Sequence, residues 1–216
     1  MTDRKALAIG IVSKVLQFVF SVLIARVIAP EDYGTASTII LAANLLFALA
    51  ELGAPETIIR VTHLSVRFLA GYLATAIVVL WLSAFVLLRF EFVMQIVGRT
   101  VTTLPLVVLL SAMMLLSVYL DAVVRRAHKF MLLAVRTLVC TMMSSLVGLS
   151  LAVIGYGYQA LLAQAYVFAG LNLLMLLSTV ARMRYQFSVE RQLDASFLRF
   201  AAPLYLQRIT ETLANR

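Results

Sequence analysis

Charged residues are scarce in this sequence, far scarcer than in soluble proteins. Only 13% of its 216 residues are Asp, Glu, Lys or Arg, whereas 63% are hydrophobic and the mean hydropathy is +1.01. Soluble domains are about half apolar and about one quarter charged. The shortage of charge excludes an ordinary soluble domain and indicates a protein that crosses a membrane several times.

Cysteine and histidine are also rare, and this limits the sites that the chain can form. Cys140 is the only cysteine and lies inside an apolar run, which excludes an internal disulfide and a cysteine-based metal site. The two histidines, His63 and His128, have no partner at the spacing of metal ligands. We therefore expect neither a metal nor a cofactor.

The net charge of +8 does not have the distribution typical of a nucleic-acid-binding protein. Lys and Arg stand at the ends of apolar runs, and no basic face interleaved with aromatic residues is present. Basic residues in such places favour the cytoplasmic side of a membrane. We interpret the basic segment 125–129 as a topology anchor that meets anionic lipid, and we expect no nucleic acid as a partner.

Long apolar runs dominate what the sequence does contain. A membrane-spanning helix needs about 20 mostly apolar residues. The segment Pro30-Glu31-Asp32-Tyr33-Gly34 is predicted to be a tight turn, because proline cannot continue a helix and glycine accepts unusual conformations. We predict an all-α membrane bundle of six helices, with a seventh starting near Phe197. The six predicted spans are 6–29, 35–59, 68–88, 102–124, 132–154 and 159–181.

The distribution of Lys and Arg predicts that the N-terminus is cytoplasmic. With that orientation the cytoplasmic segments hold most of the basic residues, and the outer segments hold only Arg89 and Arg99. The longest outer segment, 89–101, contains no histidine, no Ser-His-Asp set and no pair of carboxylates. We therefore expect no catalytic residues, and the sequence does not predict an enzyme.

Two predicted helices carry a polar side. Lys14 and Gln17 share one side of the first helix, and Asn44 and Glu51 share one side of the second, because a helix turns about 100° per residue. A charge at the centre of a bilayer costs about 2.5–3.5 kcal/mol on insertion scales. These four residues are candidates for a wet cavity. The alternative is a structural ion pair between Lys14 and Glu51. Their different predicted depths in the membrane argue against it.

The fourth and fifth predicted helices carry polar residues with a structural interpretation. Asp121 and Arg125 are four residues apart at the end of the fourth helix and are predicted to form an ion pair. The fifth helix carries a narrow stripe of small and hydroxyl residues, Thr137, Thr141, Ser144 and Gly148. Small and hydroxyl residues of this kind let membrane helices approach closely, so the stripe predicts a helix contact.

Several short motifs resemble one membrane family. They are Arg26 with Pro30–Gly34, Glu51-Leu52-Gly53 and the stretch ending near Arg60; Arg125-Arg126 through Phe130; Gly155 through Leu161; and Phe197 through Leu204. In these motifs the chain resembles the polysaccharide biosynthesis (flippase) family. This family of lipid-linked oligosaccharide (O-antigen-type) flippases is part of the multidrug/oligosaccharidyl-lipid/polysaccharide exporter superfamily.

The resemblance implies a fold of two lobes. Members of this family have two six-helix lobes around a central cavity that opens alternately to each side. The chain would then contain a first lobe at 1–181, a cytoplasmic linker at 182–196 and the start of a second lobe at 197–216. We therefore expect the N-terminal half of a larger exporter, located in a bacterial inner membrane.

The resemblance also implies a cargo, an oligosaccharide on a polyprenyl diphosphate that is moved from the cytoplasmic to the periplasmic leaflet. Lys14, with Arg26, Arg60 and Arg208, is then a candidate to contact the diphosphate. Glu51 would carry a coupling proton or pair with a basic cavity residue. The implied partners are the lipid-linked oligosaccharide, membrane lipids, and glycosyltransferases or a polymerase of the same pathway.

Two other functions remain open. A cation-coupled multidrug exporter of the same superfamily would favour acidic cavity residues, whereas the embedded charges here are mostly basic. A non-transporting membrane scaffold that gathers glycosyltransferases would keep working after Lys14, Glu51 and Arg208 were made neutral.

Overall fold

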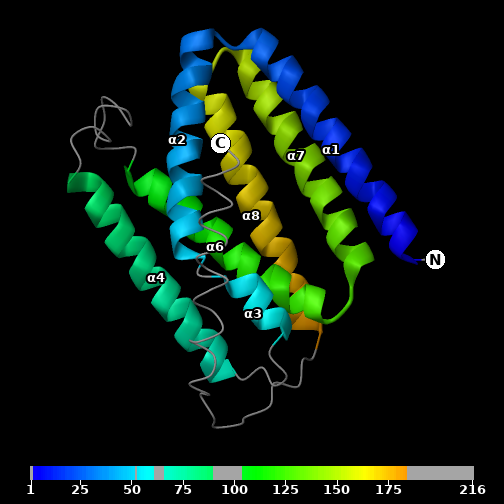
Figure 1. Ribbon diagram of the computed structural model, residues 1–216. Coiled ribbons are helices and arrows are strands. Elements are labelled where there is room, and N and C mark those ends of the chain that lie inside the picture. Colours follow the sequence, from blue (N-terminus) through cyan, green and yellow to red (C-terminus); the bar gives the residue numbers. More distant parts are fainter. Residues whose placement is uncertain (1, 52, 61–65, 90–103, 184–216) are drawn as a thin grey trace.

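The computed structural model describes residues 2–51, 53–60, 66–89 and 104–183, and within them the chain forms helices joined by short turns (Figure 1). The helices are α1 (Thr2–Val27), α2 (Pro30–Ala50), α3 (Ala54–Arg60), α4 (Val66–Arg89), α6 (Leu104–Arg126), α7 (Phe130–Ile154) and α8 (Tyr158–Arg182). Helices α1, α2, α6, α7 and α8 are long and apolar enough to span a membrane, and α4 contains a shorter apolar stretch, Leu69–Phe85. The described part of the chain is thus a helical membrane bundle.

The predicted number of spanning helices is only partly matched. Five helices of the described residues qualify as spans by length and composition, instead of six. The predicted start of a seventh helix near Phe197 lies outside the described residues. So do residues 90–101 of the predicted outer segment and residues 184–196 of the predicted linker.

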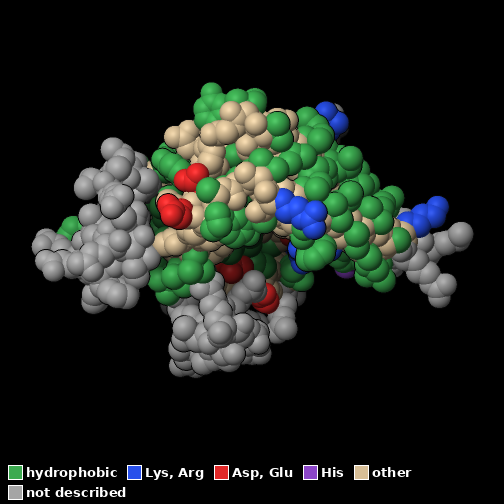
Figure 2. Space-filling view, turned by 90° about the horizontal axis from the view of Figure 1, so that it is seen from above, with side chains coloured by type: hydrophobic (Ala, Val, Ile, Leu, Met, Phe, Trp, Pro, Cys, Tyr) green, Lys and Arg blue, Asp and Glu red, His purple; other side chains and the backbone are tan. Residues whose placement is uncertain are grey.

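Helices α1 and α2, and likewise α7 and α8, run toward and away from one end of the bundle, while α4 and α6 cross it at a slant (Figure 1). Helix α1 packs mainly against α7, α7 against α8, and α8 against α6, while α6 also contacts α2, α3 and α4. The turns after α1 and after α7 lie at one end, which we call the turn end. The other end, which we call the basic end, carries Arg125, Arg126, Lys129 and Arg182. Seen from the turn end, the surface is mostly hydrophobic or uncharged, with isolated charged groups (Figure 2).

The segment Pro30–Gly34 is helical, so the predicted turn at 30–34 is wrong. Helix α1 ends at Val27, two residues connect the helices, and α2 begins at Pro30. Proline suits the first position of a helix because its ring holds φ near −65° and its missing N–H would have no partner there. Glu31 and Asp32 in the first turn add negative charge where the helix dipole favours it. Pro30 therefore starts a helix, and the chain reverses in the two residues before it.

The predicted span 35–59 is also wrong in one respect, because it is interrupted. Helix α2 ends at Ala50, and α3 begins at Ala54. Gly53 between them has a φ of +66°, a left-handed conformation that glycine accepts without steric cost. Pro55 cannot donate a backbone hydrogen bond that would continue the helical ladder from α2. Glu51 consequently lies at the C-terminal end of a helix and not inside one.

The small-residue stripe of α7 lies at helix contacts, which confirms its predicted packing role. The hydroxyl of Thr141 is 3.3 Å from that of Ser13 in α1. On the side toward α8, an added Cβ at Gly148 would come 2.9 Å from the side chain of Gln164. Ser144 is buried, with its hydroxyl donating to the carbonyl oxygen of Thr141. Helix α7 therefore fits between α1 and α8 because its contact residues are small.

The turn end is held by a close approach between the first turn of α2 and the turn before α8. Gly157 has a φ of +52°, and a Cβ at this position would collide with the carboxylate of Asp32. Gly155 ends α7 in a left-handed conformation, with its N–H 3.0 Å from the carbonyl oxygen of Ala152. Beneath these turns lies a small apolar cluster, Ile24, Ile28, Ala152 and Ala160.

We expect Gly157→Ala to destabilise the bundle by about 1–3 kcal/mol, because alanine is strained at this φ and its Cβ meets Asp32. Gly34→Ala is the matched control: Gly34 lies inside α2 with open space around it, so alanine should be neutral or slightly stabilising. Thermal unfolding of both variants in the same detergent tests this. Equal melting temperatures would contradict the close approach.

Candidate functional site

The polar side predicted on the first helix is divided between the interior and the surface of the bundle. Ser13 is buried against Thr141. Lys14 and Gln17 are exposed, and the Lys14 Nζ lies 3.5 Å from the Gln17 Oε1. Because α1 packs mainly against α7, the side that carries Lys14 and Gln17 faces away from the other helices of the bundle.

The other predicted cavity residues do not gather around Lys14. Arg26 is exposed in the last turn of α1, close to the turn end, and Asn44 is partly buried in α2. The side chain of Arg60, the last residue of α3, lies outside the described residues, and so does the whole of Arg208. The described candidates thus occupy different depths and different sides of the bundle.

Glu51 lies in the interior, separate from the exposed side of α1. Its exposed fraction is 4%, and it lies near Tyr119 of α6, which is also buried. Tyr119 in turn contacts Tyr72 of α4, with ring centroids 5.7 Å apart. Glu51 therefore belongs to a buried polar group between α2, α4 and α6. The structure does not bring Lys14 and Glu51 together as a pair.

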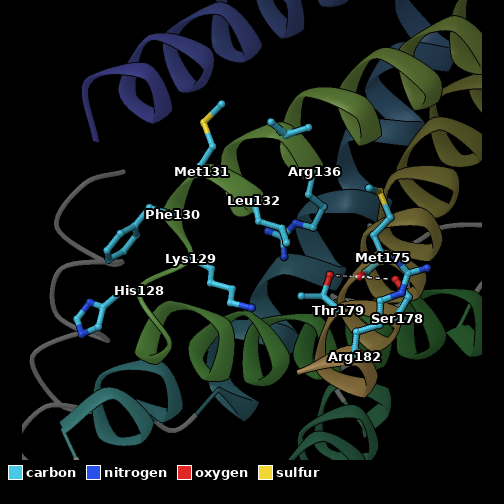
Figure 3. Close-up of a pocket in the computed structure, with 11 residues that line it drawn as sticks. His128, Lys129, Phe130, Met131, Leu132, Arg136, Met175, Ser178, Thr179 and Arg182 are labelled. Carbon is cyan, nitrogen blue, oxygen red and sulfur yellow. Dashed lines mark hydrogen bonds between the residues drawn. The ribbon is translucent and has the colours of Figure 1, made fainter. Parts of the chain in front are cut away.

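A pocket of about 670 Å³ lies at the basic end between α7 and α8 (Figure 3). Its polar lining consists of basic and hydroxyl side chains, and its apolar lining comes mainly from the first turns of α7. The lining residues are His128, Lys129, Phe130, Met131, Leu132, Val135, Arg136, Met175, Ser178, Thr179 and Arg182. None of these described lining residues is acidic. In Figure 3 the Lys129 and Arg136 side chains point toward the middle of this group.

Arg136 is the buried basic residue of this pocket. Its side chain is 8% exposed, and its Nη2 donates a hydrogen bond of 2.8 Å to the Asp121 Oδ1. Asp121 also accepts a hydrogen bond from Arg125, which confirms the predicted pair of Asp121 and Arg125. Within the described residues, the Nε and Nη1 of Arg136 are buried and have no hydrogen-bond partner. A guanidinium has five N–H donors, so Arg136 keeps donors in reserve beside the pocket.

Sequence reasoning missed this pocket and the role of Arg136. The available signal was an arginine inside an apolar run, seven residues beyond the basic Lys129. Its pairing with Asp121 depends on the turn between α6 and α7, which places residues 15 positions apart side by side. Within the described residues, no three His, Cys, Asp or Glu side chains are grouped as a metal site.

Comparison with known proteins gives one finding. The chain matches the polysaccharide biosynthesis protein family over residues 23–216. The match includes every predicted cavity residue except Lys14 and Gln17, which precede it. No curated protein and no solved structure gives a significant match.

We expect Asp121→Asn to destabilise the bundle by about 3 kcal/mol, because it leaves the charge of Arg136 buried without its counter-charge. Arg125→Gln removes the other partner of Asp121, but the Arg125 side chain is 55% exposed, so its loss should cost about 0–1 kcal/mol. Thermal unfolding in one detergent compares the two variants. A larger loss for Arg125→Gln would show that the pair with Arg136 contributes little.

Proposed function

The chain belongs to the polysaccharide biosynthesis protein family, and on this premise we propose that it forms part of a membrane exporter of polysaccharide precursors. The cargo we propose is an oligosaccharide on a polyprenyl diphosphate, flipped from the cytoplasmic to the periplasmic leaflet of a bacterial inner membrane. The basic end would be cytoplasmic, because Lys and Arg favour that side. In this role the chain moves its cargo and has no catalytic residue.

The observation that carries the proposal is the exposed polar side of α1. Lys14 and Gln17 sit on a helix whose other exposed residues are mostly apolar, such as Phe18 and Val22. Sugar hydroxyls and a diphosphate cannot enter hydrocarbon without hydrogen-bond partners. An ammonium group and an amide on one side of α1 supply such partners, provided that this side faces a cavity shared with a second lobe.

We propose a role for each residue from the exposure of its side chain. Lys14 contacts the diphosphate, because its ammonium is exposed and its one described contact, with Gln17, is long. Gln17 contacts sugar, and Arg26 meets the diphosphate near the turn end as the cavity opens to that side. Arg60 and Arg208 keep the same predicted role.

Glu51 has a different place in this proposal. It is buried at the break between α2 and α3, so in this conformation it does not reach a cargo on the exposed side of α1. A carboxyl group at a helix break suits a proton carrier, because protonation changes the cost of burying it. We propose that Glu51 couples proton movement to rearrangement of α2 and α3.

We expect Lys14→Ala, introduced into the gene in its own host, to lower surface polysaccharide about tenfold or more while the protein still inserts into the membrane. The reason is the loss of a charge-assisted hydrogen bond, worth about 1.5–3 kcal/mol. Lys5→Ala is the matched control, because Lys5 is an exposed basic residue of the same helix nearer its start. Normal polysaccharide in Lys14→Ala would remove Lys14 from the mechanism.

The same strains separate the two alternative functions. A cation-coupled drug exporter should tolerate Lys14→Ala and lose drug resistance with Glu51→Gln. A scaffold should keep its function when Lys14, Glu51 and Arg208 are all made neutral. Polysaccharide yield and drug resistance, measured on the same set of variants, therefore distinguish all three functions.

A further inference from the structure

We propose that the pocket at the basic end between α7 and α8 binds the phosphate group of an anionic membrane lipid whose headgroup carries hydroxyls, as phosphatidylglycerol does. This site is separate from the exposed side of α1 and does not depend on the proposed transport function. Its volume of about 670 Å³ falls within the range of about 300–1,000 Å³ that small-molecule sites occupy.

The anion preference comes from the buried guanidinium. Burying N–H donors without partners costs about 1–3 kcal/mol, and more for a charged group. The Nε and Nη1 of Arg136 are in this position within the described residues, because its bond to Asp121 uses Nη2 alone. A phosphate presents several oxygens and can accept two N–H bonds from one guanidinium. The two groups have almost no accessible surface in this conformation, so a phosphate satisfies them once the side chains that cover Arg136 move aside.

Positive charge and free backbone donors around Arg136 favour the same ligand. Lys129 and Arg182 are exposed basic residues of the lining, one before α7 and one at the end of α8. The first N–H groups of a helix have no partner inside the helix. No side chain caps the N-terminus of α7, and its first turn contains no acidic residue. The start of α7 therefore adds its dipole to the attraction of an anion.

The two hydroxyl residues of the lining indicate which groups the lipid headgroup carries beside its phosphate. Ser178 donates its proton to the carbonyl oxygen of Met175 at 2.9 Å, and Thr179 donates to the same oxygen at 2.7 Å. Each hydroxyl has one proton, so both oxygens remain only as acceptors toward a ligand. A headgroup with hydroxyl donors next to its phosphate matches them, and a bare phosphate dianion does not.

The apolar lining favours a lipid over a soluble phosphate. Phe130, Leu132 and Val135 are exposed on the first turns of α7, directly beside the basic residues. Helix α7 is apolar enough to span a membrane, and the pocket lies at its start, near the depth of lipid headgroups. An acyl chain can therefore lie along these side chains while the phosphate contacts Arg136.

Binding can be tested by thermal unfolding of the purified protein in a neutral detergent with added short-chain phosphatidylglycerol. We expect a saturable rise in melting temperature of about 5–10 °C when the lipid is about hundredfold above its Kd. Phosphatidylcholine, with a neutral headgroup, should give little rise. An equal rise with phosphatidylcholine would overturn the anion preference, and an equal rise with inorganic phosphate would overturn the assignment to lipid.

Two sets of variants locate the site. Lys129→Gln with Arg182→Gln should weaken phosphatidylglycerol binding about tenfold or more, and Lys129→Gln alone should weaken it less. Lys5→Gln is the control for Lys129→Gln, because it removes one exposed positive charge near the start of α1, outside the pocket lining, and should not weaken binding. Asp121→Asn with Arg136→Gln removes the buried pair together, so no charge is left alone, and should abolish the response. An unchanged response in the variant that lacks Lys129 and Arg182, or in the variant that lacks Asp121 and Arg136, would overturn the site.

Geranyl diphosphate separates this site from a cargo site. Under our proposal it binds no more tightly than phosphatidylglycerol, because it lacks hydroxyl donors for Ser178 and Thr179. The opposite outcome is that geranyl diphosphate binds about tenfold more tightly than phosphatidylglycerol and loses this binding in the variant that lacks Lys129 and Arg182. That result would assign the pocket to a diphosphate cargo and overturn the lipid assignment. None of these measurements requires transport, so failure here leaves the proposed function untouched.

Discussion

The interior of a bilayer offers no hydrogen-bond partner to a polar group, and the structure of this chain depends on that constraint. Backbone groups are satisfied by helices, which make up nearly all of the described residues. Hydroxyl side chains follow the same rule. Thr38, Ser117 and Ser150 each donate to the carbonyl oxygen one turn earlier in their own helix. Such residues add polarity to the sequence without needing water.

Charged side chains cannot be satisfied in this way, and the bundle treats them in three ways. Arg136 is buried with Asp121 as its counter-charge. Glu51 is buried at a helix break, near Tyr119. Lys14 is exposed on α1, away from the other helices. These three environments support three different proposed roles: an anion site at the basic end, proton coupling in the interior, and contact with cargo on the exposed side.

Local sequence patterns predicted the helical class and most helix positions, because spanning helices need long apolar runs. They also predicted the pair of Asp121 and Arg125 and the packing role of the α7 stripe, since both depend on spacing within one helix. The predicted turn at 30–34 and the uninterrupted span 35–59 were wrong because the same residues are compatible with two local structures. Pro30 can end a helix or begin one, and the segment from Glu51 to Pro55 can read as a continuous apolar helix although Gly53 turns left-handed there.

The sequence by itself determined that the chain is a helical membrane protein with a few embedded charges, because hydropathy and helical period are local properties. Only the tertiary structure decided which of those charges meet. Arg136 reaches Asp121 because the turn between α6 and α7 brings the end of one helix beside the start of the next, and Lys14 stays apart from Glu51 because α1 packs on α7, far from the end of α2. The physical reason is that a helix fixes the angle between its own side chains, whereas their partners depend on which helices pack together.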